Sequence, residues 1–235
     1  GVTGVVGGLL IWLALSRMSL PKTSEEAVSE NKDVSENEVK DATVGWGITD
    51  PAGFGMLASA GLLDTGTRYA FLSFLPFLLQ EKGAAIESVG FALSLVFAGG
   101  AAGKFACGMF AEKFGIIRTV VVTELMTACC IASLIFLPLW PSLLMLPVIG
   151  VVLNGTSSVL YGTVSEFVSE QRHARAFALF YTVLLTSGAI APILFGAVGD
   201  TMGLEASFAI IAVVAGCIIL ICPFLSPRIV EPPRG

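Results

Sequence analysis

Long apolar runs separated by short polar connectors fill most of the sequence after residue 50. Six of these runs are long enough for a helix to cross a hydrocarbon core of about 30 Å, which takes roughly 20 residues. Because the connectors are short, consecutive helices are expected to be antiparallel. The pattern therefore predicts an all-α membrane protein, with a six-helix transmembrane bundle over residues 51–228. The expected helices cover residues 52–79, 86–111, 118–139, 142–168, 174–198 and 206–225.

The two ends of the chain follow a different pattern. Residues 1–16 begin with an apolar run that would measure about 22 Å as a helix, which is too short to cross a membrane. We interpret them as the end of a truncated transmembrane helix. Residues 17–50 are polar and acidic, which predicts a disordered cytoplasmic linker. Residues 229–235 are expected to form a cytoplasmic tail, and the chain would then be the later part of a longer protein.

The composition supports a membrane protein and excludes several other classes. Hydrophobic residues make up 55% of the chain and charged residues 13%, whereas soluble domains average about 25% charged residues. No basic patch indicates nucleic-acid binding. The five cysteines all lie in apolar runs, where packing explains them better than disulfides or a metal site. The sequence contains no triad of catalytic residues and no phosphate-binding glycine loop, so we expect neither an enzyme nor a cofactor.

The basic residues predict the orientation of the bundle. Lys82 falls on one side of the alternating helices, whereas ten other basic residues, including Lys113, Arg118 and Arg228, fall on the opposite side. Connectors rich in Lys and Arg are retained in the cytoplasm. We therefore expect the acidic linker and the C-terminus to be cytoplasmic, in a multi-pass protein of the cytoplasmic or plasma membrane.

A charged connector punctuated by glycines joins the second and third apolar runs. Glycine permits close helix approach and the positive φ that often ends a helix. We expect Gly108 to allow a close helix contact and Gly115 to form the turn. The charged groups of Glu112, Lys113 and Arg118 would lie together at the membrane surface, where they can form ion pairs.

This connector resembles the signature loop of the major facilitator superfamily of secondary transporters. In that family the loop lies between helices 2 and 3, and a weaker copy lies between helices 8 and 9. Gly108, Glu112, Lys113, Gly115 and Arg118 match the pattern. The sequence departs from it at Glu112, where Asp is usual, and at residues 116–117, where a basic residue is common. These departures are typical of the weaker copy.

A second stretch and the layout of the whole chain extend the resemblance. The spacing of Gly188, Pro192 and Gly196 places small or helix-bending residues on one face, which favours helix packing and a kink. The stretch is similar to helix 11 of the family.

The order of elements resembles the C-terminal half of a twelve-helix transporter: the end of helix 6, a linker, then helices 7–12. The resemblance implies alternating access and a missing N-terminal half. Pro76 would bend helix 7, either as a gate or as a tolerated kink.

Three charged residues lie well inside the apolar runs, where ionised groups are costly. Asp64 and Arg68 are four residues apart on the first run, so they share a helix face and can pair. Lys104 lies at comparable depth on the next run, which could bring it to Asp64. The three form either a structural ion pair with Lys104 reaching toward the surface, or the lining of a central passage in which Asp64 carries a proton. Lys104 also resembles a basic residue of monocarboxylate-type members of the family.

The remaining polar residues in the runs have open assignments. Glu124 lies close to the start of its helix, so we expect it to pair with Lys113, Arg172 or Arg175 rather than to contact substrate. On the fourth run, Thr156, Ser157 and two further residues either line the passage or bond between helices. The candidate pathway residues are Asp64, Arg68, Tyr69, Lys104, Asn154 and Tyr161.

The function expected from these residues and from the resemblance is secondary transport of a small solute by alternating access. Coupling to protons, as symport or antiport, follows from the role given to Asp64. Two bases facing one acid favour an anionic or carboxylate-bearing substrate. The expected partners are this solute, protons, the lipid bilayer and the missing N-terminal six-helix half. The alternative is a sensor or scaffold that keeps the fold without transport, and a channel is a third option.

Overall fold

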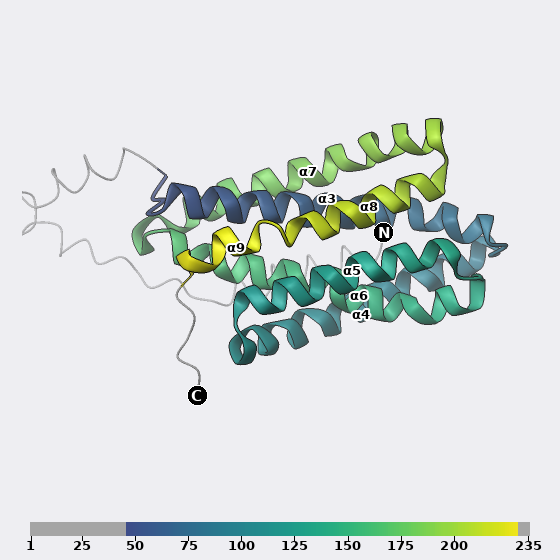
Figure 1. Cartoon of the computed structure of the whole chain (residues 1–235), viewed down its shortest axis with the longest axis horizontal. Coiled ribbons are helices and arrows are strands. Elements are labelled where there is room, and N and C mark those ends of the chain that lie inside the picture. The colour runs from purple at the N-terminus through teal and green to yellow at the C-terminus, as the bar shows by residue number, and fades with distance from the viewer. Residues whose placement is uncertain (1–45, 230–235) are drawn as a thin grey trace, which may run out of the picture. The chain divides into compact units, whose positions relative to one another are not determined.

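The computed structural model of the chain describes residues 46–229. Within this part, helices follow one another with short turns and no sheet is formed (Figure 1). The interpretations given above to residues 1–45 and 230–235 lie outside the described residues. The long helices are α3 (Pro51–Glu81), α4 (Ile86–Phe114), α5 (Ile116–Phe136), α6 (Leu139–Thr163), α7 (His173–Met202) and α8 (Leu204–Ile218); the short ones are η2 (Val164–Phe167), η3 (Glu170–Arg172), α9 (Cys222–Leu225) and η4 (Ser226–Arg228).

The helices confirm the all-α membrane fold. Five segments of the described chain are long and apolar enough to cross a membrane: residues 86–114, 116–136, 139–167, 170–202 and 204–228. Helix α3, with 31 residues, is also long enough. It is less apolar than the others because it carries the buried side chains of Asp64, Thr65 and Thr67.

The last predicted helix is interrupted. The sequence predicts one helix over residues 206–225, but α8 ends at Ile218 and a turn leads to the short helix α9. Pro223 lies in the first turn of α9. Proline has no backbone N–H and fits the start of a helix, whereas in the interior it removes a hydrogen bond and kinks or breaks the helix.

The long helices form two sets that pack side by side (Figure 1). Helices α3, α7 and α8 pack on one another, and so do α4, α5 and α6; contacts of α5 with α8 and of α3 with α6 join the sets. The helix pair in closest contact is α4 with α6. A Cβ atom at Gly99 or Gly103 of α4 would collide with the backbone of α6 at Pro147 or Val151. Glycine at these positions therefore permits the contact.

The buried apolar side chains form two separate cores along the bundle. One core contains Leu57, Leu160 and Phe180. The other contains Phe71 and Ile131, with their neighbours further along the same helices. On α3, α5 and α6 several of the buried residues between the two cores are polar, namely Asp64, Thr65, Thr67, Thr123, Glu124, Thr127, Thr156 and Ser157. The fold thus encloses a polar layer between two apolar ones.

The two glycines of the charged connector have different roles. Gly115 forms the turn that was predicted for it. It has φ +93°, ends α4 and allows α5 to start at the next residue. The role predicted for Gly108 is wrong for the described chain, since a Cβ atom there would meet nothing within 4 Å.

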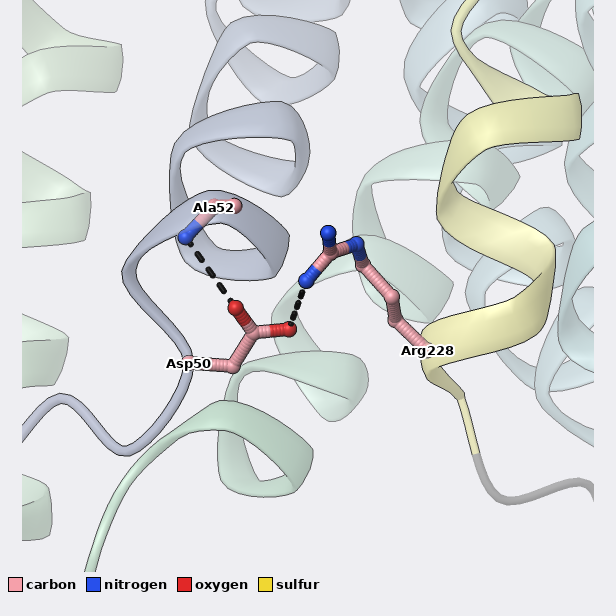
Figure 2. Close-up of polar contacts among 3 residues, drawn as sticks. All are labelled: Asp50, Ala52 and Arg228. Atoms are coloured by element: carbon pink, nitrogen blue, oxygen red, sulfur yellow. Dashed lines mark hydrogen bonds and ion pairs between the residues drawn. The ribbon is translucent and has the colours of Figure 1, made fainter.

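The start of α3 is attached to two other segments of the chain. The backbone N–H of Thr49 donates to the carbonyl of Phe167 (2.9 Å), and that of Ser169 donates to Gly47 (2.9 Å). Figure 2 shows the side chain of Asp50 accepting from the N–H of Ala52 (3.1 Å) and from Nη1 of Arg228 (2.6 Å). Asp50 thereby caps α3 and holds the end of the last helical segment. We call this end of the bundle the Asp50 end.

The opposite end of the bundle contains Lys82, and we call it the Lys82 end. The ammonium group of Lys82 donates to the carbonyl oxygens of Leu137 (2.5 Å) and Ile135 (3.3 Å). These carbonyls belong to the last turn of α5 and the residue that follows it. The lysine therefore satisfies acceptors that the helix leaves open.

Candidate functional site

A cluster of buried polar residues lies between the two apolar cores. Four of its members have almost no exposed surface: Asp64 is 3% exposed, Glu124 1%, Thr156 0% and Ser157 2%. They come from three helices, namely α3, α5 and α6. Burial of polar and ionisable groups is costly unless they are paired. Their partners therefore define the site.

Ser157 connects the acid and the base of α3. Nη1 of Arg68 donates to Oγ of Ser157 (2.8 Å), and the same hydroxyl donates to Oδ2 of Asp64 (2.8 Å). Asp64 and Arg68 are one turn apart on α3, as predicted from the sequence. They do not form a direct ion pair; among the described residues, the ion pair within 4.0 Å is that of Asp50 with Arg228. A serine of α6 thus mediates the contact between the two charged residues.

Arg68 is held between two tyrosines. Its guanidinium carbon lies 5.7 Å from the ring centroid of Tyr69. The Tyr161 hydroxyl of α6 lies within hydrogen-bonding range of the same guanidinium. Tyr161 also packs against Phe180 and Tyr181 of α7. The structure therefore brings together four of the predicted pathway residues, namely Asp64, Arg68, Tyr69 and Tyr161.

Glu124 completes the cluster from α5, and its predicted position was wrong. Its carboxyl group is buried beside Asp64 and Thr156, and not at the membrane surface beside basic residues. The error has a physical reason: α5 packs against both α6 and α8, so the face that carries Glu124 points into the bundle. A carboxylate accepts but cannot donate, so a hydrogen bond between these two carboxyl groups requires a proton on one of them.

A pattern in the sequence could have identified Glu124. Thr119, Thr123 and Thr127 recur every four residues beside it within an otherwise apolar run, and all three are buried. A polar stripe of helical period on a membrane-spanning helix marks a face that points into protein. The hydroxyl of Thr156 donates to Oγ1 of Thr123 (2.7 Å), which joins this stripe to α6.

Two of the predicted pathway residues are not part of the cluster. Lys104 is exposed on α4, and its expected approach to Asp64 is wrong because α4 packs against α6 and makes few contacts with α3. The amide of Asn154 donates to the carbonyl of Gly150 on its own helix (3.2 Å). A short connector makes two helices antiparallel, but it does not make them neighbours along their length.

The charged residues of the connector, Glu112, Lys113 and Arg118, are exposed. Among the described residues, none of the charged groups of Glu112, Lys113 and Arg118 is in an ion pair, so the pairing considered above is not formed. The ammonium of Lys113 lies 5.5 Å from the ring centroid of Phe114. The basic groups of this connector are therefore available to partners outside the described chain.

The helix-packing residues of α7 face α3. A Cβ atom at Gly188 would collide with the ring of Tyr69, and one at Gly196 would touch the ring of Phe74 at 3.5 Å. Pro76 and Pro192 lie inside α3 and α7, both of which continue past them. Gly188 therefore makes room for an aromatic residue beside the site.

A cavity of about 440 Å³ lies between α3 and α7, next to this contact. Its lining is mainly apolar and includes Gly66, Thr67, Thr186 and Ser187. The hydroxyl of Thr67 is buried without a hydrogen-bond partner in the structure. The volume lies within the range of about 300–1,000 Å³ that small-molecule sites occupy. Within residues 46–229, no group of His, Cys, Asp and Glu side chains is arranged to hold a metal ion.

Comparison with known proteins identifies the family. The family model of the Major Facilitator Superfamily matches residues 57–235. The chain belongs to the Major Facilitator Superfamily. The resemblance found in the charged connector and in the helix order is thus confirmed, and the chain is an integral membrane protein. A search among curated proteins gave no match.

Solved structures of the superfamily share the fold. The crystal structure of the POT family transporter PepTSo matches with a TM-score of 0.67 and 15% identity. An auto-inhibited POT family peptide transporter matches with a TM-score of 0.66 and 16% identity. Each match covers 79% of this chain but 39% of the other. The chain therefore spans about two fifths of the length of these superfamily transporters, and at this identity the likeness shows the fold alone.

Proposed function

We propose that this chain is the C-terminal half of a proton-coupled secondary transporter for a small solute. The observation that carries the proposal is the buried contact of Asp64 with Glu124, bridged through Ser157 to Arg68. Ionisable groups inside a membrane bundle generally mark ion or proton pathways. Membership of a family of secondary transporters and the fold shared with POT family transporters support the same function.

The geometry suggests how a proton would be held. A proton shared between the neighbouring carboxyl groups of Asp64 and Glu124 would keep them from repelling each other, and the Ser157 hydroxyl links Asp64 to the guanidinium of Arg68. On release of that proton, two negative charges would face each other, and the nearby Arg68 would compensate for one of them. The two protonation states therefore favour different arrangements of α3, α5 and α6. This difference is what couples a proton to a conformational change in alternating access.

The substrate that the site favours is anionic or carboxylate-bearing. Arg68 is half-buried between two tyrosines and presents a planar donor group suited to a carboxylate. The preference rests on Arg68 alone, because Lys104 is remote from the cluster. The missing N-terminal half would supply the facing wall of the site, since alternating access in this family works between two halves.

The orientation proposed is that of the positive-inside rule. The Asp50 end, with Lys113, Arg118 and Arg228, would be cytoplasmic, together with the linker and the C-terminus. The Lys82 end would face the outside of the cytoplasmic or plasma membrane. The bundle of residues 51–228 is the transmembrane domain in this proposal.

Reconstitution of the full-length protein tests this function. Proteoliposomes would be screened with small anionic and neutral solutes, with and without an imposed pH gradient. We expect saturable uptake that rises with the gradient, and loss of the gradient dependence in Asp64→Asn and Glu124→Gln. Asp200→Asn, an exposed acid at the Lys82 end, is the matched control and should behave as the wild type.

The same experiment separates the alternatives. A sensor or scaffold would transport no solute, and Asp64→Asn would change neither folding nor partner binding. A channel would conduct without saturation. Uptake that is equal with and without the gradient, in a wild type that transports, would refute the proton coupling and leave a facilitator.

A further inference from the structure

A second cavity lies on the outside of α4, α5 and α6, far along these helices from the Lys82 end. Its volume is about 630 Å³. Phe110, Phe114 and Arg118 line it close to the charged connector, and Val122, Met126 and Val148 line the deeper part. We call this cavity the α4–α5 groove. It is distinct from the cavity between α3 and α7 and shares no lining residue with it.

The wall of the groove offers no free polar group. The two threonines in its lining are turned to their own helix: Thr119 donates to the carbonyl of Gly115 (2.9 Å), and Thr123 donates to that of Thr119 (2.9 Å). The remaining lining is apolar except for Arg118. An apolar groove of this size on the surface of a membrane-spanning bundle is suited to a hydrocarbon chain and unsuited to a polar solute.

The length of the groove corresponds to one leaflet of a bilayer. Arg118 stands at the third residue of α5, at the membrane surface, and Met126 lies eight residues further into the helix. Eight residues of helix advance about 12 Å, and half of the hydrocarbon core measures about 15 Å. The groove therefore runs from the surface at the Asp50 end to near the middle of the membrane.

The mouth of the groove is basic. Arg118 is exposed and lines it, and Lys113 is exposed beside Phe114, whose ring also lines it. Glu112 is the acid on the same connector, and neither base is in an ion pair with it or with another carboxylate of the described chain. Guanidinium and ammonium groups at a headgroup level bind phosphate, and basic sites between transmembrane helices attract anionic lipids.

We propose that the α4–α5 groove binds one anionic phospholipid, with an acyl chain along Val122 and Val148 and the headgroup phosphate at Arg118 and Lys113. The proposal rests on the membrane placement of the bundle and does not depend on the transport activity. The net negative charge of the headgroup, opposite two bases and one acid, is what distinguishes this lipid from a zwitterionic one of the same chain length.

Native mass spectrometry of the full-length protein tests the site. The purified protein would be titrated with phosphatidylglycerol and, separately, with phosphatidylcholine of identical chains, and the dissociation constant of the first bound lipid measured. We expect tighter binding of phosphatidylglycerol. Arg118→Gln should weaken it about five-fold, the effect of about one basic residue at a membrane surface, and should weaken phosphatidylcholine less, because its choline offsets the charge of its phosphate.

A second pair of variants tests the apolar part. Val122→Trp fills the groove and should abolish tight binding of the first lipid, whereas Val213→Trp, at an equally exposed position on α8, should not. Val148→Phe replaces Val122→Trp if that variant fails to fold. Arg175→Gln, an exposed base at the same end outside the groove, is the control for charge.

Three results would overturn the proposal. Equal binding of the two lipids would exclude recognition of charge. An unchanged constant in Arg118→Gln would exclude the proposed headgroup position. An unchanged constant in both Val122→Trp and Val148→Phe would show that the groove is covered, for example by the N-terminal half, and that the lipid binds elsewhere.

Discussion

The carboxyl groups of Asp64 on α3 and Glu124 on α5 are buried neighbours in the middle of the bundle. They are 60 positions apart in the chain, and α4 lies between their two helices in the sequence. Two apolar cores enclose them from both ends of the bundle. Two neighbouring carboxylates without water repel each other, so a proton bound at this pair would favour the packing of the three helices seen here.

Ser157→Ala should destabilise the bundle. The serine hydroxyl bridges Arg68 and Asp64, and its loss leaves two buried polar groups without that partner. We expect a decrease of about 1–3 kcal/mol in the free energy of unfolding, measured as a lower midpoint of thermal unfolding in detergent. Ser158→Ala removes a hydroxyl bonded to Gly155 of its own helix (2.8 Å) and more distantly to the carbonyl of Lys104 on α4 (3.4 Å), and should have a smaller effect because it bridges no charged groups. Equal midpoints for the two variants would contradict the bridge.

The Asp50–Arg228 contact should make stability depend on pH. The hydrogen bond from Arg228 and those from the start of α3 hold the pKa of Asp50 below its ordinary value of 3.8. A carboxyl group with a lowered pKa in the folded state stabilises the fold above the ordinary value, and this contribution is lost as the pH falls below it. Asp50→Asn, which retains a capping side chain, should therefore unfold at a lower temperature than the wild type at pH 7, and the difference should shrink as the pH falls through the lowered pKa of Asp50.

Arg228→Gln provides the check on this assignment. It should lower the unfolding temperature at pH 7 as Asp50→Asn does, and the double variant should be no less stable than either single one, because both changes break the same ion pair. Additive losses would show that Asp50 and Arg228 stabilise the fold through separate contacts.

Alanine at two glycines of α4 should have opposite effects. Gly99→Ala places a methyl group against the backbone carbonyl of Pro147 on α6, and Gly108→Ala places one in open space. The first should cost about 1–3 kcal/mol by overpacking, whereas the second should be neutral or stabilise by up to about 1 kcal/mol through helix propensity. Thermal unfolding of the two variants in detergent measures both. A neutral Gly99→Ala would mean that α4 and α6 can separate at no cost.

Cysteine labelling should place the two ends of the bundle on opposite sides of the membrane. In a background without the five native cysteines, Glu81→Cys and Glu112→Cys introduce thiols at exposed positions of the Lys82 and Asp50 ends. A membrane-impermeant maleimide added to intact cells should label the first, and the second only after permeabilisation. Labelling of both positions in intact cells would contradict the threading and the membrane orientation.

The sequence predicted most of the fold because the signals are local. A run of about 20 apolar residues specifies a spanning helix wherever it lies, and Gly115 ends α4 as its conformational freedom suggested. It predicted Asp64 and Arg68 as neighbours because four residues on a helix share a face. The position of Lys104 was wrong, and so was that of Glu124, because both depend on which helices pack together.

Local chemistry alone therefore determined that this protein is a helical membrane bundle with charged residues inside α3, whereas the family came from the resemblance of the charged connector and of the helix order. Periodicity and apolar length act within one segment and need no knowledge of its neighbours. Only the tertiary structure decided that Ser157 bridges Asp64 to Arg68 and that Glu124 of α5 completes the site. These neighbours are set by contacts between segments distant in the sequence, such as the close packing of α4 on α6 that Gly99 and Gly103 permit. The energies of such contacts depend on both segments and cannot be derived from either one alone.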